Sequence, residues 1–241
     1  MIMIRRASVL LPFLFLSLSI CAQETPKPRR VPRPDIPGSF IFEFGFNRGQ
    51  KTPANFNQGF WGSRTLNLYY QYPIRILKSN FSFVPAIGFS LERFKLVNNY
   101  TLNPVKDADG SYPLISANLI RPGTFKSMII TDYLEVPIAF RFDTHPDDMS
   151  RSFNITIGGR AGVLVQGLTK IKYKEDGESK IFKDKQSHGL NHYRYSLFSR
   201  IGVGGFHLFT YYNFSTLFET NKGPQLTGMN TYTVGISING F

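Results

Sequence analysis

From Gly38 onward the chain repeats one pattern eight times: large apolar side chains alternate with small or polar ones over short segments separated by turn-rich breaks. Successive side chains of a strand point to opposite faces of a sheet, so each segment predicts a strand with one apolar and one polar face. In the first segment phenylalanine stands at every second position from Phe40 to Phe46. The predicted strands cover residues 39–48, 65–72, 81–92, 131–142, 153–165, 193–204, 207–219 and 231–239.

The polar faces of these segments consist mainly of Gly, Ser, Thr, Asn and Ala. A soluble β-sandwich would carry Lys and Glu on its outer face, whereas the inside of an eight-stranded barrel has just enough room for its side chains. We therefore expect residues 38–241 to form an all-β fold, an eight-stranded antiparallel transmembrane up-and-down β-barrel with its apolar face toward lipid. The alternative is the inverted assignment, a soluble barrel packed with aromatic side chains. Candidates for interfacial aromatic girdles are Tyr70, Tyr72, Tyr193, Tyr195 and Tyr232.

The breaks between the segments alternate in length. The long breaks are 49–63, 98–127, 171–190 and 220–228, and the short ones are 73–79, 143–151 and 204–206. Short turns at one end and long loops at the other are typical of bacterial outer-membrane barrels. We expect both ends of the barrel domain on the short-turn side, which faces the periplasm.

The N-terminus has the three parts of a secretory signal over residues 1–22. Arg5 and Arg6 precede an apolar core that is too short to span a membrane as a helix, and small residues lead to Ala22. In the alternative interpretation the single cysteine, Cys21, is acylated as in a lipoprotein. Residues 23–37 contain five prolines and four Lys or Arg, which predicts an extended periplasmic leader. These features predict location in the bacterial outer membrane.

The formal net charge of +12 raises the question of a nucleic-acid partner. No basic helix or RNP-like motif accompanies the charge, so we expect no nucleic acid and attribute the excess to a surface that meets anionic lipid head groups. The lysines of residues 170–185 are interleaved with acids and predict a solvated hairpin tip. The functional alternative for this segment is contact with lipopolysaccharide phosphates.

We expect no catalytic residue, no cofactor and no metal site. The histidines are scattered without ligand spacing, and Asp107–Gly110 predicts a turn because the distal bidentate Glu of a calcium loop is absent. Ser196, His192 and Glu219 could form the nucleophile, the base and the orienting acid, in that order, of a lipid-modifying barrel. Their expected place on the lumen side would keep them from an acyl chain, so we expect no enzyme.

Charged side chains also fall on the predicted lumen face. The candidate lumen charge network is Glu43, Glu92, Glu135, Arg141, Arg160, Arg194 and Arg200. In an antiparallel hairpin the numbers of paired residues sum to a constant, and a turn centred near Asp147 gives 295. This register places Glu135 directly opposite Arg160 and Arg141 beside Asn154. It predicts a buried Glu135–Arg160 ion pair as a structural plug, with Arg200 at the same level.

The segment Tyr133-Leu134-Glu135-Val136-Pro137-Ile138 resembles the YLEIP motif of an outer-membrane β-barrel family of Bacteroidota that includes PorT-like proteins. The run from Phe214 to Phe218 is similar to the penultimate strand of that family. The end of the chain at Phe241 also fits, since such barrels tend to end in an aromatic residue read by the barrel-insertion machinery. The resemblance covers residues 38–241 and implies the fold and the membrane.

Together these features predict a small integral outer-membrane barrel protein with a structural or accessory role in the envelope, or in a secretion assembly. Its expected partners are outer-membrane lipid and lipopolysaccharide, the insertion machinery, and proteins of the envelope or of a secretion complex. The alternatives are a narrow channel and, more remotely, a lipid-modifying barrel enzyme. A channel would be narrow because Tyr133, Phe198 and several arginines are expected inside.

Overall fold

The computed structural model describes residues 38–148 and 150–240. Within these ranges it contains β-strands and two short 3-10 turns, and neither turn is a helix that could cross a membrane. The predicted signal peptide, the predicted leader and Phe241 lie outside the described residues. The elements are β1 (Ser39–Gln50), β2 (Arg64–Gln71), β3 (Ile74–Arg75), β4 (Phe81–Leu96), β5 (Tyr100–Leu102), β6 (Leu114–Ser116), η1 (Ala117–Leu119), β7 (Thr124–Asp143), β8 (Phe153–Glu175), β9 (Glu178–Asp184), β10 (Tyr193–Val203), β11 (Phe206–Asn213), η2 (Pro224–Leu226) and β12 (Asn230–Asn239).

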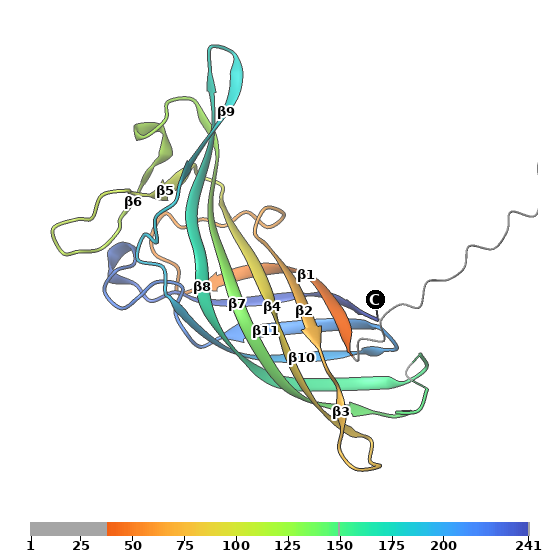
Figure 1. Cartoon of the computed structure of the whole chain (residues 1–241). Coiled ribbons are helices and arrows are strands. Elements are labelled where there is room, and N and C mark those ends of the chain that lie inside the picture. Colours follow the sequence, from red (N-terminus) through yellow and green to blue (C-terminus); the bar gives the residue numbers. More distant parts are fainter. Residues whose placement is uncertain (1–37, 149, 241) are drawn as a thin grey trace, which may run out of the picture. The chain divides into compact units, whose positions relative to one another are not determined.

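Eight of these strands close into a ring (Figure 1). The order around the ring is β1, β2, β4, β7, β8, β10, β11 and β12, every neighbouring pair is antiparallel, and β12 returns to β1. A closed ring has no free sheet edge. The predicted fold class is confirmed: the chain forms an eight-stranded antiparallel up-and-down barrel of the transmembrane class.

The connections between ring strands alternate in length, as predicted from the breaks in the sequence. The short connections are 72–80, 144–152 and 204–205, and the long ones are 51–63, 97–123, 176–192 and 214–229. Both ends of the barrel lie on the short-turn side, where the hydroxyl of Ser39 donates a hydrogen bond to Asn239 Oδ1 at 2.8 Å.

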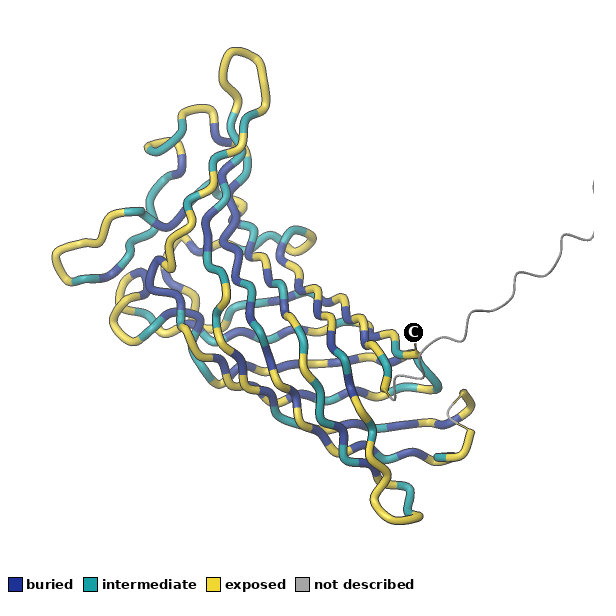
Figure 2. The backbone as a smooth tube through the Cα atoms, viewed as in Figure 1, coloured by how far each residue is buried: buried dark blue, intermediate teal, exposed yellow. Residues whose placement is uncertain are grey.

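Buried and exposed residues alternate along the ring strands, as the bands of Figure 2 show, so successive side chains face the lumen and the outside in turn. Phe42 on β1 is 46% exposed, whereas its neighbour Glu43 is 1% exposed. The inverted assignment is therefore wrong, because the outward faces carry the Phe, Leu, Ile and Val side chains. On β4 this apolar belt runs from Phe81 to Leu91. Ten residue steps at about 3.3 Å and a tilt of about 40° give a belt roughly 25 Å high, as in membrane barrels.

The five girdle tyrosines fall into two groups at opposite ends of the belt. Tyr70 pairs with Phe40, near the start of β1, and Tyr72 follows β2 on the short-turn side. Tyr232 pairs with Arg48, near the end of β1, which places it on the long-loop side. The other two, Tyr193 and Tyr195, are at the start of β10 on that same side.

Strands β7 and β8 extend well past the predicted segments 131–142 and 153–165. A β-bulge interrupts their pairing: Tyr133 pairs with Leu164 and Asp132 with Gln166, which leaves Val165 unpaired. A bulge shifts the alternation by one residue, so a strict period of two ends there although the strand continues.

The prolonged strands end in a hairpin that the sequence predicted as a solvated tip. Strand β9 returns alongside β8 after the two-residue turn Asp176–Gly177. Both residues have positive φ (53° and 81°), the conformation of the hairpin turn that Asp-Gly favours.

The seventh ring strand is shorter than predicted. Strand β11 ends at Asn213, so Glu219 lies in a loop and does not top a strand. The run from Phe214 to Phe218, which the family resemblance assigns to a strand, leaves the barrel wall instead. Leu217 and Phe218 turn inward and are buried among the loops.

Candidate functional site

All seven charged side chains predicted for the lumen point inward and are buried. Each is 5% exposed or less. A fourth carboxylate, Asp143 on β7, lies with them at 2% exposure. Four guanidinium groups therefore share the lumen with four carboxylates, and their formal charges cancel.

Glu135 is the centre of the first group of contacts. Its Oε2 lies 2.8 Å from Arg160 Nη1, and its Oε1 lies 2.5 Å from Arg194 Nη2. The hydroxyl of Tyr69 donates a further hydrogen bond to Oε2 at 2.5 Å. Arg194 also reaches Glu92 at 2.7 Å, so the group extends across β2, β4, β7, β8 and β10.

The predicted ion pair between Glu135 and Arg160 is present, but the predicted register is wrong by two residues. Glu135 is opposite Gly162, and Arg160 is opposite Pro137, so the paired numbers sum to 297. The same shift places Arg141 opposite Thr156 instead of beside Asn154. The ion pair forms diagonally, because diagonal neighbours in a sheet are within reach of a long side chain.

Glu43 is the centre of a second group. Its Oε1 accepts a hydrogen bond from Arg200 Nε at 2.6 Å, and its Oε2 accepts one from the hydroxyl of Tyr211 at 2.5 Å. Asn67 Nδ2 donates to the same Oε2 at 2.7 Å. Arg200 therefore pairs with Glu43, and the expectation that it would lie at the level of Glu135 is wrong. Arg194 takes that place.

The remaining predicted residue, Arg141, pairs along its own strand. Its Nη2 lies 2.7 Å from Asp143 Oδ1, and both side chains are buried. Asp143 lies two residues from Arg141 on the same face, so the alternation rule could have found it. Tyr69 lay on the predicted lumen face as well, but Tyr211 belonged to a strand too aromatic for its faces to be distinguished.

Aromatic rings complete the packing around the guanidinium groups. Arg160 lies over Tyr211 with its Cζ 3.9 Å from the ring centroid, and Arg194 lies 4.0 Å from the centroid of Tyr133. A cation over an aromatic face is stabilised by the ring quadrupole, most strongly where water is excluded. Tyr133 and Phe198, which were predicted to narrow the lumen, are both buried.

An apolar cluster fills the lumen toward the long loops. It joins inward residues of β4 and β7 to residues of the loops. Its members are Phe56, Phe94, Leu96, Leu102, Ile129, Leu190, Leu217, Phe218 and Met229. Ion pairs and this cluster together occupy the lumen, which is the packed interior expected for eight strands.

Of the three residues considered for catalysis, His192 and Glu219 meet, but Ser196 lies apart from them. His192 Nδ1 lies 2.5 Å from Glu219 Oε1 in the exposed loops. Ser196 is instead buried in the lumen, where its hydroxyl donates to Asn213 Oδ1 at 2.5 Å and accepts from Arg160 Nε. The segment Asp107–Gly110 forms the predicted turn, in which Gly110 N donates to Asp107 O. Among the described residues no three His, Cys, Asp or Glu side chains are grouped to hold a metal ion.

Comparison with known proteins returns structures of membrane barrels at low similarity. No protein-family model matches the chain, and no curated protein matches it. The attachment invasion locus protein Ail of Yersinia pestis is 13% identical, with 84% of this chain and 97% of that chain covered and a TM-score of 0.36. In its complex with the heparin analogue sucrose octasulfate the same protein is 12% identical, with 85% of this chain and 100% of that chain covered and a TM-score of 0.34. A mutant porin of Rh. blastica is 9% identical, with 84% of this chain and 98% of that chain covered and a TM-score of 0.19. At these TM-scores the likeness carries no argument, and the fold rests on the strand pairing.

Proposed function

We propose that this chain is an integral outer-membrane β-barrel protein with a structural or accessory role in the bacterial envelope. One observation carries the proposal: a continuous apolar belt surrounds a closed barrel whose lumen is filled by paired charges. Exposing such a belt to water is unfavourable, and a lipid bilayer is the solvent that fits it.

The filled lumen argues against the alternative of a narrow channel. Ions would have to pass Arg160 and Glu135, whose side chains are fully buried, and then the apolar cluster below the loops. A lipid-modifying activity is disfavoured too, because Ser196 is engaged with Asn213 and lies apart from the exposed His192. The proposal therefore assigns the protein neither transport nor catalysis.

We also propose kinship with the PorT-like proteins of Bacteroidota, on the resemblance of one segment whose role in this barrel can be described. The glutamate of the YLEIP-like segment is Glu135, the residue that pairs with two lumen arginines. The proline of the segment, Pro137, is opposite Arg160 in the sheet. We infer that this motif holds the interior of the barrel together.

We further propose that the short turns and both ends of the barrel domain face the periplasm, so that the long loops face outward. The signal peptide, the leader and recognition by the insertion machinery belong to the same proposal. The partners would then be outer-membrane lipid and lipopolysaccharide around the belt, and envelope or secretion-complex proteins at the loops.

Fractionation and conductance measurements test this proposal. Expressed in a Gram-negative host, the full chain should be recovered in the outer-membrane fraction and should require detergent for extraction. In planar bilayers the purified barrel should produce no unitary current steps, with a known porin as the positive control. Recovery in the soluble periplasmic fraction would contradict the membrane assignment, and regular current steps would contradict the closed lumen.

A pulldown tests the accessory role. Partners captured from solubilised outer membranes should depend on loop 97–123, so a variant in which Gly-Gly replaces residues 104–110 should lose them while it still folds, because the paired residues of β5 and β6 are kept. Identical captures by both forms would count against a role for this loop.

A further inference from the structure

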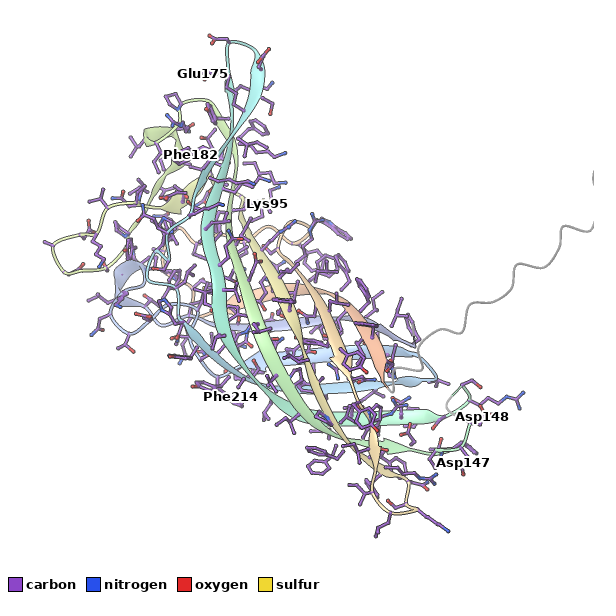
Figure 3. The ribbon with its side chains drawn as sticks, in the orientation of Figure 1. Lys95, Asp147, Asp148, Glu175, Phe182 and Phe214 are labelled. Carbon is purple, nitrogen blue, oxygen red and sulfur yellow. The ribbon has the colours of Figure 1, made fainter. Side chains whose placement is uncertain are left out.

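Seven cationic side chains lie on the outward face of the sheet, just beyond the loop-side border of the apolar belt. We call this set the basic face. Strands β4, β7 and β8 continue past the belt here, and β9 pairs with the end of β8 (Figure 1; Figure 3 labels Lys95 on this part of the sheet). The members of the basic face are Arg64, Arg93, Lys95, Lys126, Lys170, Lys172 and Lys183.

Like charges on this face are directly opposed across the strands. Arg64 is opposite Arg93, Lys126 is opposite Lys172, and Lys170 is opposite Lys183. Directly opposed like charges destabilise a sheet. Three such pairs lie next to one another, and an anion from outside the protein would reduce the repulsion within them.

No carboxylate of the described residues lies within 4 Å of a cation of the basic face. Elsewhere on the same extension Lys180 is paired with Glu175 at 2.8 Å. Burial, together with neighbouring cations such as Lys95 and Lys172, lowers the pKa of Lys126, which stands beyond the apolar belt. Asp132, half-buried on the adjoining part of β7, interacts electrostatically with Arg93 but does not approach it within 4 Å, so the protein offsets only part of the repulsion within the basic face.

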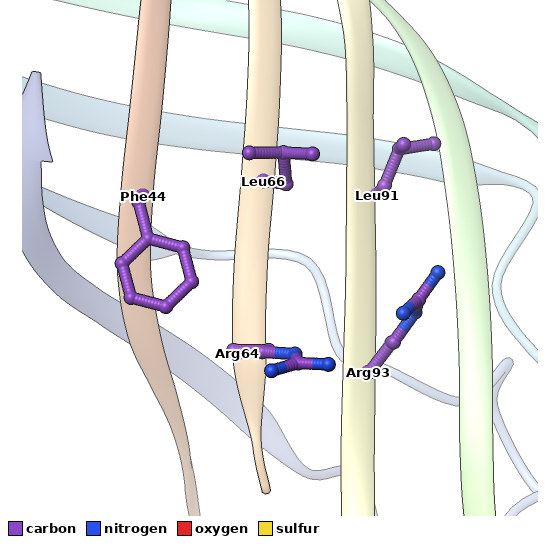
Figure 4. Close-up of a pocket in the computed structure, with 5 residues that line it drawn as sticks. All are labelled: Phe44, Arg64, Leu66, Leu91 and Arg93. Carbon is purple, nitrogen blue, oxygen red and sulfur yellow. The ribbon is translucent and has the colours of Figure 1, made fainter. Parts of the chain in front are cut away.

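An apolar groove leads from the belt to the edge of the basic face (Figure 4). Phe44, Leu66 and Leu91 line it, Arg64 and Arg93 flank it on the loop side, and its volume is about 200 Å³. A guanidinium pair at the end of an apolar groove suits an amphiphile with an anionic head. Three apolar residues of the extension, Met128, Ile130 and Leu168, pack together on the same outward side.

We propose that the basic face and this groove bind lipopolysaccharide through the phosphates of its lipid A part, with an acyl chain in the groove. The inference rests on the proposed function, which places the long-loop end of the barrel in the outer leaflet. From β2 to β9 the face extends over four strand spacings, about 19 Å at 4.8 Å each. That width suits a head group with two separated phosphates better than one with a single phosphate.

The single tryptophan of the chain stands beside this site and can report on it. Trp61 is 79% exposed and packs edge-on against Phe46 and Phe60. The next residue, Gly62, lies against the Lys95 side chain so closely that an added Cβ would collide with it. A lipid head group on the basic face would change the surroundings of Trp61.

The experiment is a fluorescence titration of the full chain, folded in zwitterionic detergent, with bis-phosphorylated lipid A, dephosphorylated lipid A and inorganic phosphate. Lipid A should change the Trp61 emission saturably, whereas the other two probes should bind far more weakly. At about fivefold per cation near a membrane surface, neutralising Lys126, Lys170 and Lys172 to Gln should weaken binding about 100-fold. The matched control, Lys180→Gln with Lys222→Gln, should leave binding unchanged.

Equal binding of dephosphorylated lipid A, or full affinity in the triple variant, would overturn the proposal. Each variant is first shown to be a folded barrel by its faster migration in gels before boiling. A wild-type chain that fails this check contradicts the membrane proposal itself, whereas a folded barrel without phosphate-dependent binding contradicts the lipid site alone. If the triple variant does not fold, Arg64→Gln with Arg93→Gln serves the same test and should also lose phosphate-dependent affinity.

Discussion

The substitution Glu135→Gln gives a decisive test of the lumen network. It removes one carboxylate charge and keeps the shape of the side chain. In the wild type this carboxylate pairs with Arg160 at 2.8 Å and Arg194 at 2.5 Å, and the side chains of Glu135 and Arg160 are fully buried. The change therefore leaves one guanidinium group in the lumen without a carboxylate partner.

The size of the effect depends on which carboxylate partner each arginine retains in the variant. Arg194 keeps Glu92 at 2.7 Å, but Arg160 keeps no carboxylate among the described residues. An uncompensated buried charge costs about 3–5 kcal/mol, so we expect Glu135→Gln to lower the free energy of unfolding by that amount. Arg160→Met should cost less, roughly 1.5–3 kcal/mol, because Glu135 still has Arg194.

Replacing both partners should restore part of the loss. The double variant Glu135→Leu with Arg160→Met leaves no stranded charge at this position, so it should be more stable than Glu135→Gln alone. The assay is urea unfolding of barrels refolded into lipid vesicles, followed by the electrophoretic shift between folded and unfolded forms.

The exposed pair Arg75–Asp147 provides a matched control. Its atoms lie 2.7 Å apart, but Asp147 is 87% exposed at the tip of a short turn (Figure 3). Asp147→Asn should therefore change the stability by less than about 1 kcal/mol. Our account of the lumen is refuted if Glu135→Gln is no more harmful than this control, or if the double variant is no more stable than Glu135→Gln alone.

Two further predictions concern the loop side. Lys172→Glu places a carboxylate opposite Lys126, so it should raise the thermal stability in neutral detergent by about 0.2–1 kcal/mol; a lowered melting temperature would contradict the repulsion we describe. Hydrogen bonds from Lys222 and His192 hold the pKa of Glu219 below its ordinary value. A carboxyl with a lowered pKa stabilises its loop above its unfolded pKa, and this is lost as the pH falls through the folded value. Amide hydrogen exchange, corrected for its intrinsic pH dependence, should show less protection of loop 214–229 at about pH 3 than at about pH 6, and Glu219→Gln should abolish this difference; equal protection of the wild-type loop at the two pH values would contradict it.

Much of the fold follows from one periodicity. Alternation placed the strands, their order along the chain and the lumen face, because a strand buried on one side admits only one phase. It also identified the seven lumen charges without any knowledge of the strand pairing. What alternation does not fix is the register, since sums of 295 and 297 both keep the same faces inside.

The register error arose in the turn between β7 and β8. A centre near Asp147 was expected, but Thr144 N donates to Phe153 O, which continues the pairing whose numbers sum to 297. Moving the centre of a turn by one residue changes the sum by two. Apart from Pro146 and Met149 the break 143–151 is polar, and nothing in its composition marks the centre.

The extension beyond the barrel was missed for a different reason. The bulge at Val165 reverses the phase of β8, so Lys170 and Lys172 fall on the outward face although they continue a strand whose lower outward residues are odd-numbered. Only the pairing of β4, β7 and β8 brings these lysines beside Arg93 and Lys126. A basic face assembled in this way cannot be read from spacing along the chain.

Depth-dependent quenching by lipid measures the central claim, that the outward apolar belt faces a bilayer. In a Trp61→Phe background, one tryptophan replaces Phe89 within the belt, and a control variant carries it at Val105 in the long loop 97–123. Both positions are exposed on the protein surface, at 49% and 68%. In vesicles of lipids brominated on their acyl chains, fluorescence at position 89 should be strongly quenched and that at position 105 should not. Equal quenching at the two positions, or none at position 89, would contradict a membrane-spanning barrel.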